Sequence, residues 1–156
     1  MNDRFEPMKL TRRSVLLTAA SASAFGWLAR PALADPEDVT AARTALFGDA
    51  PVTEGRVEVS LPPISENGFS VPIEIDVESP MTPDDHVTRI AVFSPRNPLA
   101  DIAHFQLGPR AGRARIETRI RLGGTQKVTV VAEMNDGSLW SGHAETVVTL
   151  AACVVL

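Results

Sequence analysis

Hydrophobic and polar residues alternate along much of the chain beyond residue 56. The clearest run is 71–78, in which Val71, Ile73, Ile75 and Val77 are separated by Pro72, Glu74, Asp76 and Glu78. A period of two predicts a β-strand with one buried face, and Pro72 places this strand at a sheet edge or its start. Similar apolar runs predict six further strands, at 57–61, 87–93, 103–107, 114–122, 128–134 and 139–150. Of these, 87–93 is apolar at both parities and is predicted to be central.

The segment 35–48 follows a helical pattern instead. Asp35 is suited to the N-cap, Pro36 to the first helical position, and Gly48 to the residue that ends the helix. Its apolar residues fall at helical spacing: Val39, Ala42 and Leu46. The pattern as a whole predicts an all-β fold, an immunoglobulin-like antiparallel β-sandwich of about seven strands preceded by a short N-terminal helix.

The first 34 residues have the features of an export signal. Arg12 and Arg13 precede an apolar stretch from Val15 to Leu28, and a small-x-small pattern ends at Ala34. These are the parts of a secretory signal peptide, and the paired arginines are typical of twin-arginine export. The alternative is an amphipathic helix of the mature fold. We expect residues 1–34 to be a twin-arginine signal cleaved near Ala34, and the mature protein to be periplasmic.

Removal of the signal changes the charge. The full chain has a net charge of −4, and cleavage after Ala34 leaves ten basic and 17 acidic residues, a net charge of −7. An acidic chain is poorly suited to nucleic acid or to an anionic membrane surface, so neither is an expected partner. With a single cysteine, the chain cannot form an internal disulfide.

The sequence contains no recognisable catalytic constellation. His86, His104 and His143 are scattered without metal-ligand spacing, and no phosphate-binding loop or nucleophile elbow is present. We therefore expect a protein that is not an enzyme, with no metal and no cofactor.

Four arginines fall on the polar side of the strand predicted at 114–122: Arg113, Arg115, Arg119 and Arg121. One interpretation is that they hold an oxyanion or an acidic partner. The other is that they pair with Glu58, Glu74 or Asp76 on neighbouring strands.

The only cysteine, Cys153, lies in the segment Ala151-Ala152-Cys153-Val154-Val155-Leu156. Leu150 to Cys153 spells a lipobox, but a lipobox belongs at the end of a signal peptide. A free cysteine can be buried as a small apolar residue. An unpaired cysteine in an exported protein also indicates intermolecular pairing or a reactive thiol.

From about residue 45 to Cys153, the sequence resembles the SoxY family, the sulfur carriers of the periplasmic thiosulfate-oxidising Sox system. The resemblance lies in these segments: Phe47–Asp49, Glu54-Gly55, Glu66–Pro72, Glu78–Val87, Arg89–Pro98, Pro109–Gln126 and Val130–Trp140. It implies a sandwich domain at 35–150 and a C-terminal arm at 151–156, with Cys153 as the covalent attachment site for sulfur.

The resemblance also implies partners. A carrier of this family pairs with a SoxZ-like subunit and makes transient contacts with a c-type cytochrome, a dimanganese sulfate-thiol hydrolase and a sulfane dehydrogenase. The arm departs from the family pattern, because Ala-Ala-Cys-Val-Val-Leu stands where the family has Gly-Gly-Cys-Gly-Gly. Valine is stiffer and bulkier than glycine. The alternative expectation is therefore a diverged interaction subunit that is not a carrier, with a buried, inert terminal cysteine.

Overall fold

The computed structural model describes residues 34–152. The predicted signal peptide, apart from Ala34, and the predicted attachment site Cys153 lie outside the described residues. The elements of the described part, in chain order, are α2 (Pro36–Phe47), β1 (Val52–Glu54), β2 (Val57–Ser60), β3 (Ile64–Ser65), β4 (Val71–Val77), β5 (Val87–Phe93), β6 (Asp101–Gln106), the 3-10 turn η2 (Pro109–Ala111), β7 (Ala114–Ile120), β8 (Gln126–Met134) and β9 (Leu139–Val148).

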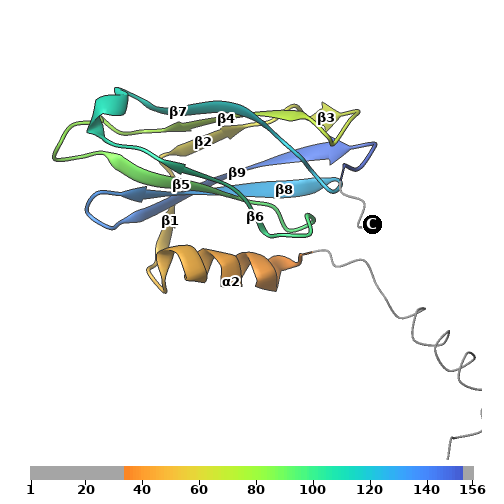
Figure 1. Ribbon diagram of the computed structural model, residues 1–156, viewed down its shortest axis with the longest axis horizontal. Coiled ribbons are helices and arrows are strands. Elements are labelled where there is room, and N and C mark those ends of the chain that lie inside the picture. The colour runs from red at the N-terminus through yellow and green to blue at the C-terminus, as the bar shows by residue number, and fades with distance from the viewer. Residues whose placement is uncertain (1–33, 153–156) are drawn as a thin grey trace, which may run out of the picture. The chain divides into compact units, whose positions relative to one another are not determined.

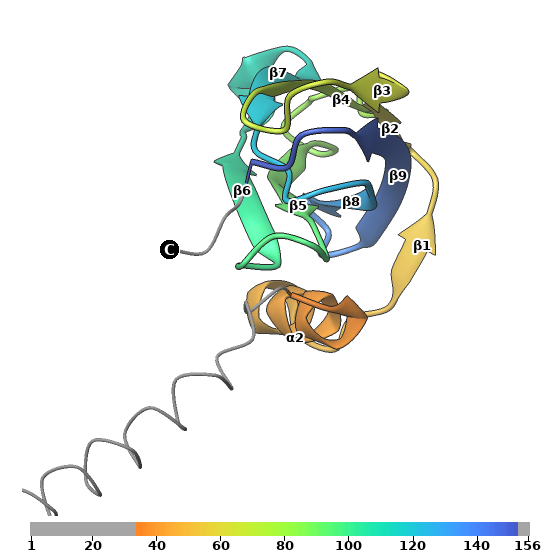
Figure 2. The ribbon, with the colours of Figure 1, turned by 90° about the vertical axis from the view of Figure 1, so that its right-hand side faces the viewer.

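The strands form two layers of an immunoglobulin-like sandwich, as the sequence predicts (Figure 1). The larger sheet has the order β1-β9-β8-β5-β6, with β3 also paired to β9, and the smaller sheet has the order β2-β4-β7. Consequently β6 and β7 are edge strands of different sheets. Both lie on the same side of the sandwich (Figure 2).

The alternation in β4 determines how the two layers meet. Val71, Ile73, Ile75 and Val77 are each no more than 2% exposed, whereas the polar residues between them face outward. They pack in one cluster with apolar residues of β5 and β8. Burial of this much apolar surface is the main favourable contribution to folding, and it confirms the prediction of a strand with one buried face.

The strand predicted to be central, β5, is covered on both faces. Ile90 and Val92 face the other sheet, while Ala91 and Phe93 face the other way and pack with Val39, Ala42 and Leu46 of α2. The helix therefore covers the outer face of the larger sheet (Figure 2). No helix in residues 34–152 is long and apolar enough to cross a membrane.

The helix boundaries follow the predicted signals. The Asp35 side chain accepts hydrogen bonds from the backbone N–H groups of Glu37 and Asp38, at 2.8 and 3.0 Å. The Asp38 side chain in turn accepts a hydrogen bond from the Asp35 N–H at 3.0 Å, which completes a capping box. At the other end, Gly48 has φ +70°, a conformation that favours glycine.

The structure has two strands that the sequence pattern did not predict. β1 and β3 are only three and two residues long, too short to show a period of two. Both pair parallel with β9, so the sandwich is not antiparallel throughout. The last strand also ends earlier than predicted, at Val148 rather than Leu150.

Candidate functional site

The segment after β9 leads to Cys153 and is hydrogen-bonded to the sandwich. The backbone N–H of Thr149 donates to the Ser65 carbonyl at 3.1 Å, and the Thr149 hydroxyl donates to the Glu66 carbonyl at 3.1 Å. The carbonyl of Leu150 then accepts from the Gly68 N–H at 2.8 Å. The polypeptide is thus held by the loop between β3 and β4 after the strand itself has ended.

Ala152 is the last described residue before the cysteine. Its backbone N–H donates to the carbonyl oxygen of Leu122 at 3.0 Å, and the residue is only 7% exposed. Backbone groups that are buried and paired in this way resist displacement. The residue immediately before Cys153 is therefore anchored on the body of the domain.

Gly68 lies at the centre of this anchor. Besides its bond to Leu150, its carbonyl accepts from the Leu122 N–H at 2.9 Å. A Cβ at position 68 would lie 2.5 Å from the Leu122 oxygen and 2.9 Å from both the Ala152 nitrogen and the Leu150 oxygen. Since three backbone segments converge on this point, only glycine fits without displacement of the chain.

Asn97 holds the other side of the anchor. Its side-chain nitrogen donates to the Arg121 carbonyl at 2.8 Å, and its side-chain oxygen accepts from the Gly123 N–H at 2.8 Å. The residue is 5% exposed. Because Arg121 and Gly123 flank Leu122, these two bonds position the carbonyl that receives Ala152.

Two further buried polar side chains, Ser94 and Gln126, lie beside Asn97, and the Gln126 side-chain nitrogen donates to the Asn97 side-chain oxygen at 3.5 Å. The Ser94 hydroxyl donates to the Gln126 side-chain oxygen at 2.6 Å, and the Arg96 N–H donates to the same oxygen at 3.1 Å. Gly123 allows the two loops to approach, since a Cβ there would lie 2.3 Å from the Arg96 carbonyl oxygen. No buried side-chain nitrogen or oxygen of the described residues lacks a hydrogen-bond partner.

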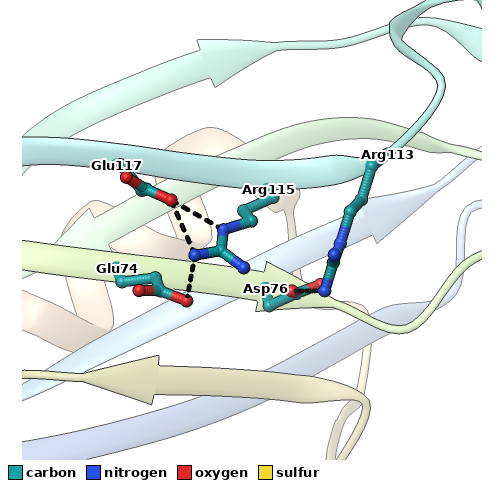
Figure 3. Close-up of polar contacts among 5 residues, drawn as sticks. All are labelled: Glu74, Asp76, Arg113, Arg115 and Glu117. Carbon is teal, nitrogen blue, oxygen red and sulfur yellow. Dashed lines mark hydrogen bonds and ion pairs between the residues drawn. The ribbon is translucent and has the colours of Figure 1, made fainter.

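The arginines of the predicted arginine face have different surroundings. Arg113 pairs with Asp76, while Arg115 pairs with Glu74 at 2.8 Å and with Glu117 at 2.6 Å (Figure 3). Only two of the four arginines, Arg115 and Arg119, lie within β7. For Arg113 and Arg115, the structure confirms the interpretation that they pair with carboxylates of a neighbouring strand.

The charge of Arg115 is reinforced by these contacts. The hydrogen bond that the guanidinium donates to Glu117 raises the pKa of Arg115 above its ordinary value, and the charges of Glu74, Glu117 and Asp76 act in the same direction. Arg115 is exposed, so water screens the interaction. It therefore contributes little to stability.

Arg119 and Arg121 lie nearer the anchor and have no carboxylate within ion-pair distance among the described residues. The Nε of Arg119 donates to the Ser70 hydroxyl at 2.7 Å. For these two residues, the predicted pairing with Glu58, Glu74 or Asp76 is not observed.

The three histidines lie apart from one another and from the anchor. His86 is 3.0 Å from the Thr82 carbonyl, His104 is 3.2 Å from Asp101, and His143 is 3.4 Å from Glu54. Within residues 34–152 there is no group of three or more histidine, cysteine, aspartate or glutamate side chains arranged to hold a metal ion.

The sequence did not identify Gly68 and Asn97 as residues of the site. Each acts on segments far away in the sequence, and neither belongs to a motif with a chemical role. The signals available were weak: Gly68 interrupts a polar loop, and Asn97 precedes a proline.

Fold and site together define an immunoglobulin-like β-sandwich whose last strand leads, through a fixed backbone anchor, to a single cysteine. Residues 43–153 match the family described as "Sulfur oxidation protein SoxY". The chain belongs to the SoxY family. A search of curated proteins finds no match.

Solved structures show the same fold. The sulfur carrier protein SoxY from Chlorobium limicola f thiosulfatophilum is 29% identical, with a TM-score of 0.62 over 73% of this chain and 98% of that one. A superoxide reductase (neelaredoxin) from Ignicoccus hospitalis is 14% identical, with a TM-score of 0.53 over 60% of this chain and 80% of that one. The second likeness shows only that the sandwich fold is shared.

Proposed function

We propose that the protein is a sulfur carrier of the thiosulfate-oxidising system and that Cys153 is its covalent attachment site. The observation that carries the proposal is that the SoxY family match extends to residue 153, which is the only cysteine of the chain. The likeness to a sulfur carrier protein of the same family supports it. The part of the chain that the structure describes contributes a scaffold that presents the thiol.

The chemistry proposed for Cys153 is a thiolate reaction. The Cys153 thiolate forms a sulfur–sulfur bond with the outer sulfur of thiosulfate, and two electrons leave to a c-type cytochrome, which is reduced. The product is a cysteine S-thiosulfonate. Water then cleaves its sulfur–sulfonate bond in a partner hydrolase, which releases sulfate and two protons and leaves the cysteine persulfide anion. The thiolate, rather than the thiol, is the form that bonds to sulfur.

The anchor at Ala152 explains how the domain would present the thiol. Because the backbone is held up to residue 152, Cys153 directly follows a fixed residue, and no long linker separates it from the sandwich. A short tether has a high effective concentration within its reach and a low one beyond it. We therefore expect each partner enzyme to dock directly against the end of the sandwich that carries Leu122 and Gly68.

We further propose that a SoxZ-like subunit covers an apolar rim beside the anchor. Four of its residues are large hydrophobic side chains between 47% and 63% exposed: Ile64, Phe69, Val147 and Leu150. Ile64 and Val147 are register partners, and the Gly68–Leu150 hydrogen bond brings Phe69 and Leu150 together. Exposed apolar side chains that gather in this way are typical of interaction surfaces. The c-type cytochrome, hydrolase and dehydrogenase would be transient partners.

Domain organisation and location follow from the same proposal. Residues 1–34 would act as a twin-arginine signal, residues 35–150 as the carrier domain and residues 151–156 as the arm. The protein would work in the periplasm, where its partners of the Sox system would also be found. The first two residues of that arm, Ala151 and Ala152, are described, and Ala152 lies on the sandwich.

A second candidate function is an interaction subunit whose cysteine carries nothing. The burial of Ala152 and the apolar residues that follow Cys153 favour it. The two functions differ in whether Cys153 can be modified by thiosulfate.

Blocking of the thiol separates these two functions. The full mature chain, with its SoxZ-like subunit, is incubated with thiosulfate and the oxidised cytochrome partner, denatured, and treated with a polyethylene-glycol maleimide. If the protein is a carrier, the loaded Cys153 cannot react with the maleimide, and the single gel shift of the chain is lost. Reduction before labelling restores the shift. Unchanged labelling would support the inert subunit, and Cys153→Ser is the control that should never shift.

A further inference from the structure

A groove separates the edge strands β6 and β7 beside the anchor. One wall consists of residues 97–99, 101 and 102, and the other is the end of β7 with Arg121. The groove has a volume of about 470 Å³ and is mostly apolar, with Ile102 and Ile120 among its lining residues. Leu99 on its rim is 71% exposed, more than any other large hydrophobic residue between 34 and 152.

The groove ends where the C-terminal segment leaves the sandwich. Its two walls are joined there by the hydrogen bond from Asn97 to the Arg121 carbonyl, and the next carbonyl, that of Leu122, receives Ala152. Figure 2 shows the segment after β9 crossing the end of the sandwich toward the side of β6 and β7. Ala152, the last described residue, is therefore bonded one residue beyond Arg121, which lines the groove.

We propose that the groove between β6 and β7 is the docking site of the chain's own segment Val154–Leu156. Three properties of the described groove and of the sequence agree. The four residues after Ala152 can span up to ~14 Å when extended, and the wall formed by residues 119–121 is ~10 Å long. The segment is entirely apolar, as the groove largely is. Valine also favours the extended conformation that a narrow groove requires.

Docking would hold Cys153 at the mouth of the groove, between the anchor and Arg121. Release of the segment would expose both the thiol and the apolar groove. Apolar burial favours the docked state, and the loss of backbone freedom opposes it, so the two states should differ little in free energy. A partner that binds Leu99 and its neighbours would compete with the segment and so free the thiol.

A cysteine pair tests the docking without any sulfur chemistry. In the Cys153→Ser background, Leu99→Cys and Val155→Cys are introduced together and exposed to a mild oxidant. We expect an intramolecular disulfide in most molecules, independent of protein concentration, because a disulfide needs Cα atoms within ~7 Å of each other. Leu99 is exposed, so its replacement leaves the core intact.

The matched control pairs Asp136→Cys with Val155→Cys in the same background. Asp136 is exposed and lies in the turn at the far end of β9. The ten residues of that strand extend ~30 Å, beyond the reach of the segment. If the Leu99 pair forms no more intramolecular disulfide than this control, the proposal is wrong. Disulfide-linked dimers in place of monomers would also overturn it, since the occupant would then be a second copy.

A second measurement uses the native cysteine. Leu99→Asp places a charge in the groove and should speed the alkylation of Cys153 by about fivefold, because it removes the docked state. Gln106→Asp, at an exposed position outside the groove and the apolar rim, should leave the rate unchanged. Equal rates in both variants and the unsubstituted chain would contradict docking. Neither measurement requires the protein to be a carrier, so its result is separate from that of thiosulfate loading.

Discussion

The N–H of Ala152 donates to the carbonyl oxygen of Leu122 at 3.0 Å, and this bond is the last contact the structure describes before the single cysteine. It connects the end of the chain to the segment between β7 and β8. The position of the thiol in the proposed carrier therefore depends on residues that are distant from it in sequence, above all Gly68 and Asn97.

Replacing Gly68 by alanine should loosen the anchor. The added Cβ would meet three backbone atoms at 2.5 to 2.9 Å, and backbone cannot yield as a flexible side chain can. Overpacking of this kind costs about 1–3 kcal/mol of unfolding free energy, which urea denaturation measures. Hydrogen exchange should also show faster exchange of the Ala152 N–H.

Gly108→Ala is the matched control for this variant. Gly108 has φ −151°, and a Cβ there would meet nothing within 4 Å. We expect a change of less than ~0.5 kcal/mol. Equal effects of the two substitutions would show that the close approach at Gly68 is not what holds the anchor.

Asn97→Ala should destabilise the loop that presents the Leu122 carbonyl. The substitution removes two bonds of 2.8 Å and leaves the Gly123 N–H and the Arg121 carbonyl without this partner. An unsatisfied buried group costs about 1–3 kcal/mol. Thermal or urea unfolding measures the loss, with the exposed Gln106→Ala as control, and a variant as stable as this control would contradict the assigned role.

Arg115→Gln should have only a small effect on stability, in spite of its two ion pairs. Both ion pairs are exposed and screened by water. The small change in the urea midpoint caused by the substitution should therefore shrink further in concentrated salt. Because its folded-state pKa is raised, the contribution of Arg115 is fully present below the unfolded-state pKa and is lost only as the pH rises through the folded value. A midpoint shift that varied across neutral pH would contradict this account.

The sequence predicted the parts of the fold that depend on periodicity. The alternation in 71–78 determined which side of β4 is buried, and the apolar run 87–93 correctly predicted a strand covered on both faces. The helix boundaries could also be predicted, because Asp35 and Gly48 act within one turn of the chain. These features are local, and local patterns determine them.

The arginine contacts were predicted only in part. The registers of β4 and β7 place Arg115 opposite Asp76, yet Arg115 pairs diagonally with Glu74 and Arg113 takes Asp76. Such choices depend on side-chain length and direction across a twisted sheet. Among the described residues, Glu58 forms no ion pair with any arginine.

The anchor could not be predicted, because it arises from contacts between distant segments. Gly68 is required only because Leu122, Leu150 and Ala152 converge on it. The strands β1 and β3 were missed for a similar reason, since their few residues are ordered by pairing with β9. Cys153 was identified from its being the only cysteine and from the family resemblance, and its role stays a prediction.

The most direct test of the carrier proposal is the intact mass of the mature chain after incubation with thiosulfate and oxidised cytochrome partner in the presence of the SoxZ-like subunit. We predict a mass increase corresponding to one thiosulfate, removed by reductant and absent in Cys153→Ser. An unmodified mass, under conditions in which another SoxY-family carrier is loaded, would contradict the proposal that Cys153 carries sulfur.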